Sequence, residues 1–334
     1  MNISYKKFLL ILFVIILYVF GYTMLPHTNF SGEKRIVIEK GQGPRNIGAM
    51  LKKERVIGLK WAFVAYVAFT NTASYLQPGT YVFREDASLP AIVSMLTQSG
   101  RKEITITIPE GWSVADIVQY LKEKSVASAE DLRALAERKD RPAAVERFLF
   151  VQELPENATL EGYLFPDTYR VFGDATAEDV IVKMLENFEK KLSPDVTSAV
   201  EMSGRSLHEN IIVASLIEKE VATDEDRVLV SGILWKRFKN GMPLQVDATI
   251  NYITGNRTTT VSIADTTIES AYNTYKYEGL PTGPIANPGL EAIRAALHPK
   301  ASGYFFYLSA PDGRTIFSKT LDEHNIAKAK YLRN

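Results

Sequence analysis

Uncharged, mostly aliphatic and aromatic residues form one long run near the N-terminus, from Phe8 to Leu25. At about 1.5 Å per residue, a helix of that length spans roughly 27 Å, close to the hydrocarbon thickness of a bilayer. Lysines precede the run and no charged residue follows it until Glu33, so the positive-inside rule places the N-terminus in the cytoplasm. A cleaved signal peptide is the alternative, but the run lacks a small-x-small cleavage site. We therefore predict a cytoplasmic tail over 1–7, a retained transmembrane helix over 8–25 and an extracytoplasmic remainder.

Two later segments share one pattern, a short alternating strand followed by a glycine turn and an amphipathic helix. The first begins at Ile36 with IVIEKGQGPRNIGAMLKKERVI and the second at Ile106 with ITIPEGWSVADIVQYLKEKSVA. When Gly41 is aligned with Gly111, the apolar positions of the two helices coincide. The pattern predicts an internal duplication, although unrelated strand–turn–helix units can also look alike by chance. A turn and strand in PGTYVF and a helix from Ser88 complete a small α+β region, which we place at 34–127.

The remainder of the chain predicts mainly helices. Residues 128–158 are charged and helical, and we interpret them as a connector. Beyond them the pattern predicts three helices and a hairpin, and so a domain over 159–334 with a helical core and small sheet elements. The fold class is therefore α+β. The predicted helices are His208 to Ala222, Asp224 to Asn240 and Pro288 to Leu297, and the hairpin strands are Tyr304 to Ser309 and Arg314 to Ser318.

Composition excludes several classes of function. Lys+Arg and Asp+Glu both number 39, so the basic excess typical of nucleic-acid binding is absent. There is no cysteine, and the four histidines are isolated in the sequence, so no metal site is expected. No phosphate-binding glycine motif or G-x-S-x-G nucleophile motif occurs, and no cofactor is expected.

Two carboxylates in the apolar helix are candidates for acid–base chemistry. Glu218 and Glu220 follow a run of aliphatic residues, and burial there would raise their pKa values towards those of a general acid. The alternative is that both are surface charges in the last helical turn, together with Lys219. The helical periodicity does not choose between the two glutamates.

Polar and aromatic residues gather in the loops that follow. They lie in LQVDATINY, from Leu244 to Tyr252, and in SAYNTYKYEGLPTGPIANPG, from Ser270 to Gly289. Aromatic rings beside amides and hydroxyls suit a sugar ring, which has apolar faces and a rim of hydroxyl groups. A structural loop that needs its Gly and Pro residues for turns is the alternative, but long irregular loops are uncommon unless they are functional.

The order and spacing of these motifs resemble the endolytic murein transglycosylase, or YceG-like, family nearly from end to end. The resemblance is carried by PGTYVF, PEGWS, LEGYLFPDTY, ASLIEKE, LQVDATINY, AYNTY, GLPTGPIANPG, the His298-Pro299 pair and EHN. Two positions depart from the family pattern, Val221 where threonine is expected and Thr282 where proline is more usual. Both are peripheral and affect the expected fine geometry of the site.

The resemblance implies specific site residues. The first glutamate of the E-K-E triplet, Glu218, is implied to be catalytic, and substrate-binding roles are implied for five further residues. No metal is implied. The implied substrate-binding residues are Gln245 and Asp247 of LQVD, Asn273 and Tyr275 of AYNTY, and Tyr163 of LEGYLFPDTY.

The resemblance also implies a cellular location, a reaction and partners. Such an enzyme is a single-pass inner-membrane protein with a LysM-like membrane-proximal portion and a periplasmic catalytic domain. It cuts the bond between N-acetylmuramic acid and N-acetylglucosamine in nascent peptidoglycan strands, leaves 1,6-anhydro ends and so terminates elongation. Its partners would be the glycan strands, peptidoglycan polymerases and other elongation proteins. The alternatives are a non-catalytic peptidoglycan-binding module and a glycan hydrolase.

Overall fold

The computed structural model describes residues 21, 32–98, 103–138, 140–173, 175–256 and 261–332. The predicted cytoplasmic tail and, apart from Gly21, the predicted transmembrane run lie outside these residues. No helix within the described ranges is both long and apolar enough to cross a bilayer. The chain divides into two compact units, Met1–Lys102 and Glu103–Asn334.

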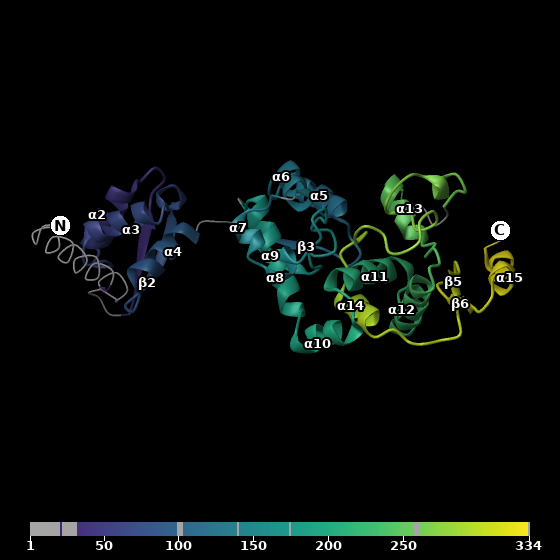
Figure 1. Ribbon diagram of the computed structural model, residues 1–334. Coiled ribbons are helices and arrows are strands. Elements are labelled where there is room, and N and C mark those ends of the chain that lie inside the picture. The colour runs from purple at the N-terminus through teal and green to yellow at the C-terminus, as the bar shows by residue number, and fades with distance from the viewer. Residues whose placement is uncertain are drawn as a thin grey trace, which may run out of the picture. The chain divides into compact units, whose positions relative to one another are not determined.

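The described part of the first unit combines a two-stranded antiparallel sheet with three α-helices (Figure 1). Ile36 lies opposite Tyr81 in the sheet, and alternate side chains of both strands enter an apolar core that the helices complete. This confirms the predicted strands and helices of the region. The elements are β1 (Glu33–Ile38), α2 (Pro44–Lys53), α3 (Lys60–Phe69), η1 (Ala73–Tyr75), β2 (Gly79–Arg84) and α4 (Leu89–Gln98), of which β1 pairs with β2.

The second unit begins with the same arrangement. Its first strand, β3 (Glu103–Thr107), pairs antiparallel with β4 (Thr168–Phe172), and Ile106 lies opposite Tyr169 just as Ile36 lies opposite Tyr81. Ser113 caps α5 with a reciprocal capping box to Asp116. The helices of this part are α5 (Val114–Glu123), α6 (Ala129–Glu137), α7 (Ala143–Glu146), α8 (Leu149–Gln152) and α9 (Ala177–Lys191).

Backbone details show that the two copies share one local structure, while their origin by duplication stays a prediction. Gly41 and Gly111 both turn with positive φ, +88° and +75°, and the residues that follow the two helices, Arg55 and Ser125, share φ values of 59° and 54°. The tyrosine of the second strand donates to the carbonyl four residues earlier in both copies. The repeat therefore extends beyond the strand–turn–helix unit to a second strand and a last helix, with α7 and α8 inserted in the second copy.

The two compact units do not follow the predicted domain limits at 127 and 158. The second copy shares one continuous apolar core with the helices that follow it, and α6 packs against both α5 and α9. Burial in a common core makes the second copy part of the C-terminal unit. The assignment of a LysM-like region, a connector and a catalytic domain stays a prediction.

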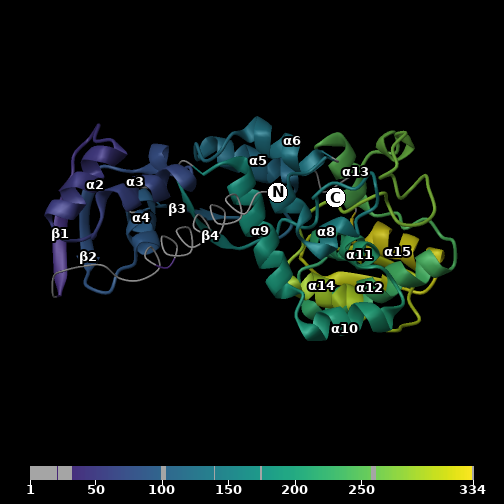
Figure 2. The same ribbon diagram turned by 60° about the vertical axis from the view of Figure 1, so that its left-hand side comes forward.

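The rest of the second unit is a helical body with one hairpin. Figures 1 and 2 show α11, α12 and α14 side by side, and α11 also contacts α13. The predicted helices, the hairpin and the α+β class with a mainly helical body are confirmed. The elements are α10 (Pro194–Ser203), α11 (Leu207–Glu220), α12 (Asp224–Lys239), α13 (Asp247–Thr254), η2 (Asp265–Thr267), α14 (Leu290–Leu297), β5 (Phe306–Ser309), β6 (Thr315–Ser318) and α15 (Leu321–Tyr331).

Helix α11 is the central element of this body. Ser206 begins it with a capping box to Glu209, and every residue from Asn210 to Ile217 is buried. Val221 then adopts an extended conformation, so the helix ends directly after the E-K-E triplet. The sequence therefore sets the triplet at the point where a buried helix emerges from the core.

Candidate active site

The Glu218 carboxyl group lies between two donors at the end of α11. Its Oε2 accepts a hydrogen bond of 3.1 Å from the backbone N–H of Gly289, and its Oε1 is 3.6 Å from Nη2 of Arg227. The Glu218 side chain is only 8% exposed and that of Arg227 13%. Burial raises the pKa of Glu218 above the usual glutamate value, while the Gly289 N–H and Arg227 act in the opposite direction. Such a carboxyl can both hold a proton and be stabilised after losing it.

The turn of the second repeat closes one side of Glu218. A Cβ atom at Gly111 would lie 3.5 Å from Cγ of Glu218 and 3.5 Å from Cδ of Lys219, so the turn backbone is in direct contact with the triplet. Lys219 donates through Nζ to the carbonyl of Gly111 at 3.2 Å, and the Gly111 N–H donates to the carbonyl of Asn287 at 2.9 Å. The PEGWS turn is thereby fixed against the end of α11.

A buried amide and a buried carboxylate support this arrangement. Asn287 is fully buried. Its Nδ2 donates to the carbonyl of Trp112 at 2.9 Å and to Glu161 at 3.1 Å. Glu161 also accepts from the Val114 N–H at 3.0 Å and from the Tyr252 hydroxyl at 3.3 Å. Burial outweighs these donors and raises the pKa of Glu161 to about 8. The pair joins the second repeat to the loop that carries Gly289.

The other glutamate of the triplet belongs to a second polar cluster. Burial, followed by the charge of Asp247, raises the pKa of Glu220 to about 7, while the Ala248 N–H and the Tyr307 hydroxyl act in the opposite direction. The Tyr275 hydroxyl donates to Oδ1 of Asp247. The structure therefore brings the predicted residues Asp247 and Tyr275 into contact with each other, beside Glu220.

Gln245 and Asn273 lie at the edge of the same cluster. Gln245 has a positive φ of 53° and accepts through Oε1 from Nη2 of Arg237 at 2.7 Å. Asn273 is 1% exposed, donates through Nδ2 to two carbonyls of its own loop and accepts the Tyr275 N–H at 3.0 Å. Asn273 thus uses its amide to shape the loop that carries Tyr275.

Tyr163 lies elsewhere, in the apolar core. It is fully buried, its ring stacks on Phe150, and its hydroxyl lies 2.9 Å from Nδ1 of His208. The structure does not bring it into contact with the other predicted site residues. Its predicted substrate contact stays a prediction.

Sequence reasoning missed several residues of the site. Glu161 and Asn287 lie within motifs that carried the resemblance, LEGYLFPDTY and IANPG, but no role was expected for them. Arg227 lies in a charged helix start, DEDR, that reads as an ordinary solvated end. Neither the motifs nor the helix start predicts that these residues lie at the candidate site.

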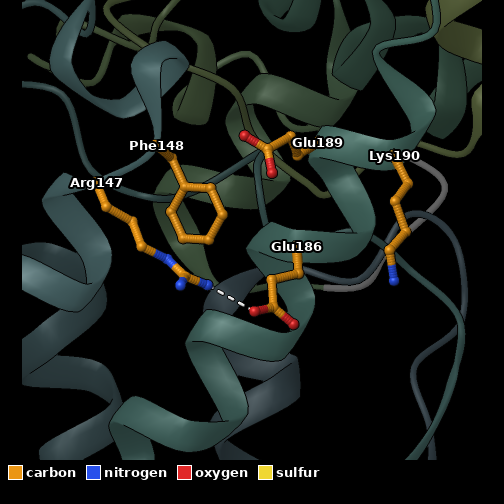
Figure 3. A pocket seen from close by; sticks show the side chains of 5 residues that line it. All are labelled: Arg147, Phe148, Glu186, Glu189 and Lys190. Atoms are coloured by element: carbon orange, nitrogen blue, oxygen red, sulfur yellow. Dashed lines mark hydrogen bonds and ion pairs between the residues drawn. The ribbon is translucent and has the colours of Figure 1, made fainter. Parts of the chain in front are cut away.

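Two further features of the described residues bear on the choice of site. Over the described ranges, no group of three or more His, Asp or Glu side chains is arranged to hold a metal ion. A cavity of about 390 Å³ lies near α8 and α9 (Figure 3), where Arg147 forms an ion pair with Glu186. Its lining includes none of the residues around Glu218 or Asp247. The lining residues are Arg147, Phe148, Glu186, Glu189 and Lys190.

Known proteins resemble this chain over most of its length. The model of the YceG-like family matches residues 36–330. An endolytic murein transglycosylase of Bacillus subtilis is 35% identical over 307 residues, which cover 89% of this chain and 84% of that protein. One of Streptococcus pneumoniae strain D39 is 30% identical over 94% of this chain, but the match covers 62% of that protein. The crystal structure of a putative YceG-like protein from Listeria monocytogenes, 28% identical, superposes with a TM-score of 0.59 over 90% of this chain and 100% of that one.

Proposed function

The chain belongs to the YceG-like family, and from this premise we propose that it is an endolytic murein transglycosylase that uses Glu218 as its acid and base. The observation that carries the assignment is the position of the Glu218 carboxyl group. It is buried at the end of α11, yet it contacts both the Gly289 N–H and Arg227. Of the two candidate glutamates, it is the one against which the PEGWS turn packs.

In the proposed reaction, Glu218 first acts as an acid. Its protonated carboxyl donates to the glycosidic oxygen between N-acetylmuramic acid and N-acetylglucosamine, and the bond from that oxygen to C1 of the muramic acid breaks. The acetamido group of the substrate stabilises the cationic centre at C1, as in other substrate-assisted enzymes. The Gly289 N–H and Arg227 stabilise the carboxylate that remains.

Glu218 then acts as a base. The carboxylate takes the proton from the C6 hydroxyl of the muramic acid, whose oxygen bonds to C1 and closes the 1,6-anhydro ring. The proton returns to Glu218 and no water is consumed. A second carboxylate that activates water is therefore not required.

The cluster around Asp247 supplies the proposed substrate contacts. Tyr275 offers an aromatic ring, and Gln245 is exposed beside it. Asn273 contributes by holding the Tyr275 loop in place. Aromatic faces and polar rims of this kind suit sugar rings.

The same proposal includes a membrane anchor at 8–25, a LysM-like region at 34–127 and a connector at 128–158. An anchor would hold residues 159–334 near the bilayer, where polymerases release new glycan strands. The uninterrupted apolar run supports the anchor. The polymerases and other elongation proteins are the proposed partners.

Product analysis tests the function. The full chain would be incubated with isolated uncrosslinked glycan strands, and the new ends identified by mass spectrometry. The proposal predicts 1,6-anhydro-muramic ends, which are lighter by one water than reducing ends. New reducing ends would instead identify a hydrolase, and binding without cleavage would identify a wall-binding module.

A further inference from the structure

Glu110 lies across a single glycine from Glu218. A Cβ atom at Gly289 would be 2.0 Å from Oε1 and 2.6 Å from Oε2 of Glu110, so this carboxyl group rests against the Cα of Gly289. The N–H of the same glycine donates to Glu218. The two carboxylates therefore contact the same residue, one through its Cα and the other through its N–H.

The backbone around Glu110 is fixed, although its side chain is exposed. Two residues earlier, the Ile108 N–H donates to the carbonyl of Asp167 at 2.9 Å, and one residue later the Gly111 N–H donates to Asn287. Both hydrogen bonds hold the turn against other segments of the unit. The position of the Glu110 backbone is thus set by the fold, within reach of Gly289 for its side chain.

The charges that surround Glu218 are mostly positive. Lys219 follows it on α11, and Arg227 faces it from α12 while also pairing with Asp224 at 2.9 Å. On α14, Glu291 and Arg294 pair with each other, and Asp247 on α13 acts on Glu220. Within the described residues, Glu110 is the anion that opposes the effects of Arg227 and Lys219 on Glu218.

We propose that Glu110 is a positioning residue of the active site, which acts across Gly289 to keep the proton on Glu218 until the glycosidic oxygen receives it. The inference rests on the proposed function of Glu218. The backbone angles of Gly289, φ −74° and ψ 170°, suit any residue, and the atoms nearest to a Cβ at this position are those of the Glu110 carboxyl, so a larger residue there would displace that carboxyl.

The pH dependence of glycan cleavage tests the role of Glu110. In Glu110→Gln the negative charge is lost, and Glu218 should release its proton at a lower pH. We expect the alkaline limb of the kcat/KM profile to move down by about half a unit to one unit, which is a fall of about three- to tenfold on that side. The KM measured at low pH should stay unchanged.

Gly289→Ala provides an independent variant that keeps both carboxylates. The new methyl group would displace the Glu110 carboxyl, and the backbone N–H to Glu218 would remain. The alkaline limb should therefore move to lower pH, as in Glu110→Gln. In the double variant the two shifts should not add, so the limb should move no further than in Glu110→Gln alone. Glu291→Gln is the matched control. It removes an exposed charge from α14, the helix that begins after Gly289, and should leave the pH profile unchanged.

Profiles of Glu110→Gln and Gly289→Ala that superpose on the wild-type profile would overturn the inference. A uniform loss of rate with no movement of the limb would also overturn it, since it would indicate a substrate contact or a structural role. Neither result affects the proposed function, which is tested separately by the ends that the wild-type chain produces and by the activity of Glu218→Gln.

Discussion

The two copies of the repeat share a backbone but differ in what their turns contact. Ile36 and Ile106 pair with equivalent tyrosines, and Gly41 and Gly111 turn with similar positive φ. At Gly41, however, no atom of the described residues lies within 4 Å of a Cβ position, whereas at Gly111 the neighbours are Glu218 and Lys219.

The residue before each turn glycine differs as well. The first copy has Lys40 where the second has Glu110. This position is therefore positive in the first copy and negative in the second. The same local structure therefore occurs in two settings. In the second copy its turn forms one side of the proposed active site at the end of α11, and in the first copy the turn has no such contact among the described residues.

The largest expected difference between the two units is in their response to pH. Glu161 is buried in the second unit with a pKa raised to about 8, and no acidic side chain in the described part of the first unit is buried. Because the folded-state pKa exceeds the unfolded value, the contribution of Glu161 to stability is fully present below about pH 4.5. It is lost as the pH rises through about 8, at about 1.4 kcal/mol per unit of pKa difference.

Hydrogen exchange followed peptide by peptide would measure both units in one chain. Between pH 5 and pH 9, peptides from the second unit should lose a few kcal/mol of protection that peptides from 33–98 keep, once intrinsic exchange rates are corrected. Glu161→Gln should flatten this dependence. An unchanged slope in that variant would show that Glu161 is ionised in the folded protein over the whole range.

A smaller effect is expected from alanine in the two turns. Gly41→Ala and Gly111→Ala place a side chain at positive φ, and each should cost its own unit about 1 kcal/mol. Only Gly111→Ala should reduce glycan cleavage, because relief of the strain moves a turn that contacts Glu218. Equal losses of activity in both variants, measured beside the unfolding free energies, would remove the distinction between the copies.

The sequence predicted local structure well because the relevant signals are local. The strand–turn–helix pattern, the Ser113 cap and the buried character of α11 all depend on residues within a few positions of one another. The two copies look alike in the sequence for the same reason. Their different environments depend on contacts between segments far apart in the chain, such as that of Asn287 with Trp112.

The helical periodicity could not choose between Glu218 and Glu220, and only the family resemblance implied Glu218. Helix α11 is buried on every side, so its apolar pattern defines no face. The structure separates the two glutamates by their partners. Glu218 contacts Arg227 of α12 and the backbone N–H of Gly289. Glu220 instead lies beside Ala248 and Tyr307. Arg227 could not be identified because a cation near acidic residues at a helix start usually lies in solvent.

The rate of glycan cleavage by Glu218→Gln, measured on isolated strands beside Glu291→Gln, tests the central assignment most directly. Glutamine keeps the shape of the side chain and can still accept from the Gly289 N–H, but it can neither donate the proton nor take it back. The account predicts a loss of at least about 100-fold for Glu218→Gln with an unchanged circular dichroism spectrum, and wild-type rates for Glu291→Gln. Wild-type cleavage by the folded Glu218→Gln variant would contradict it.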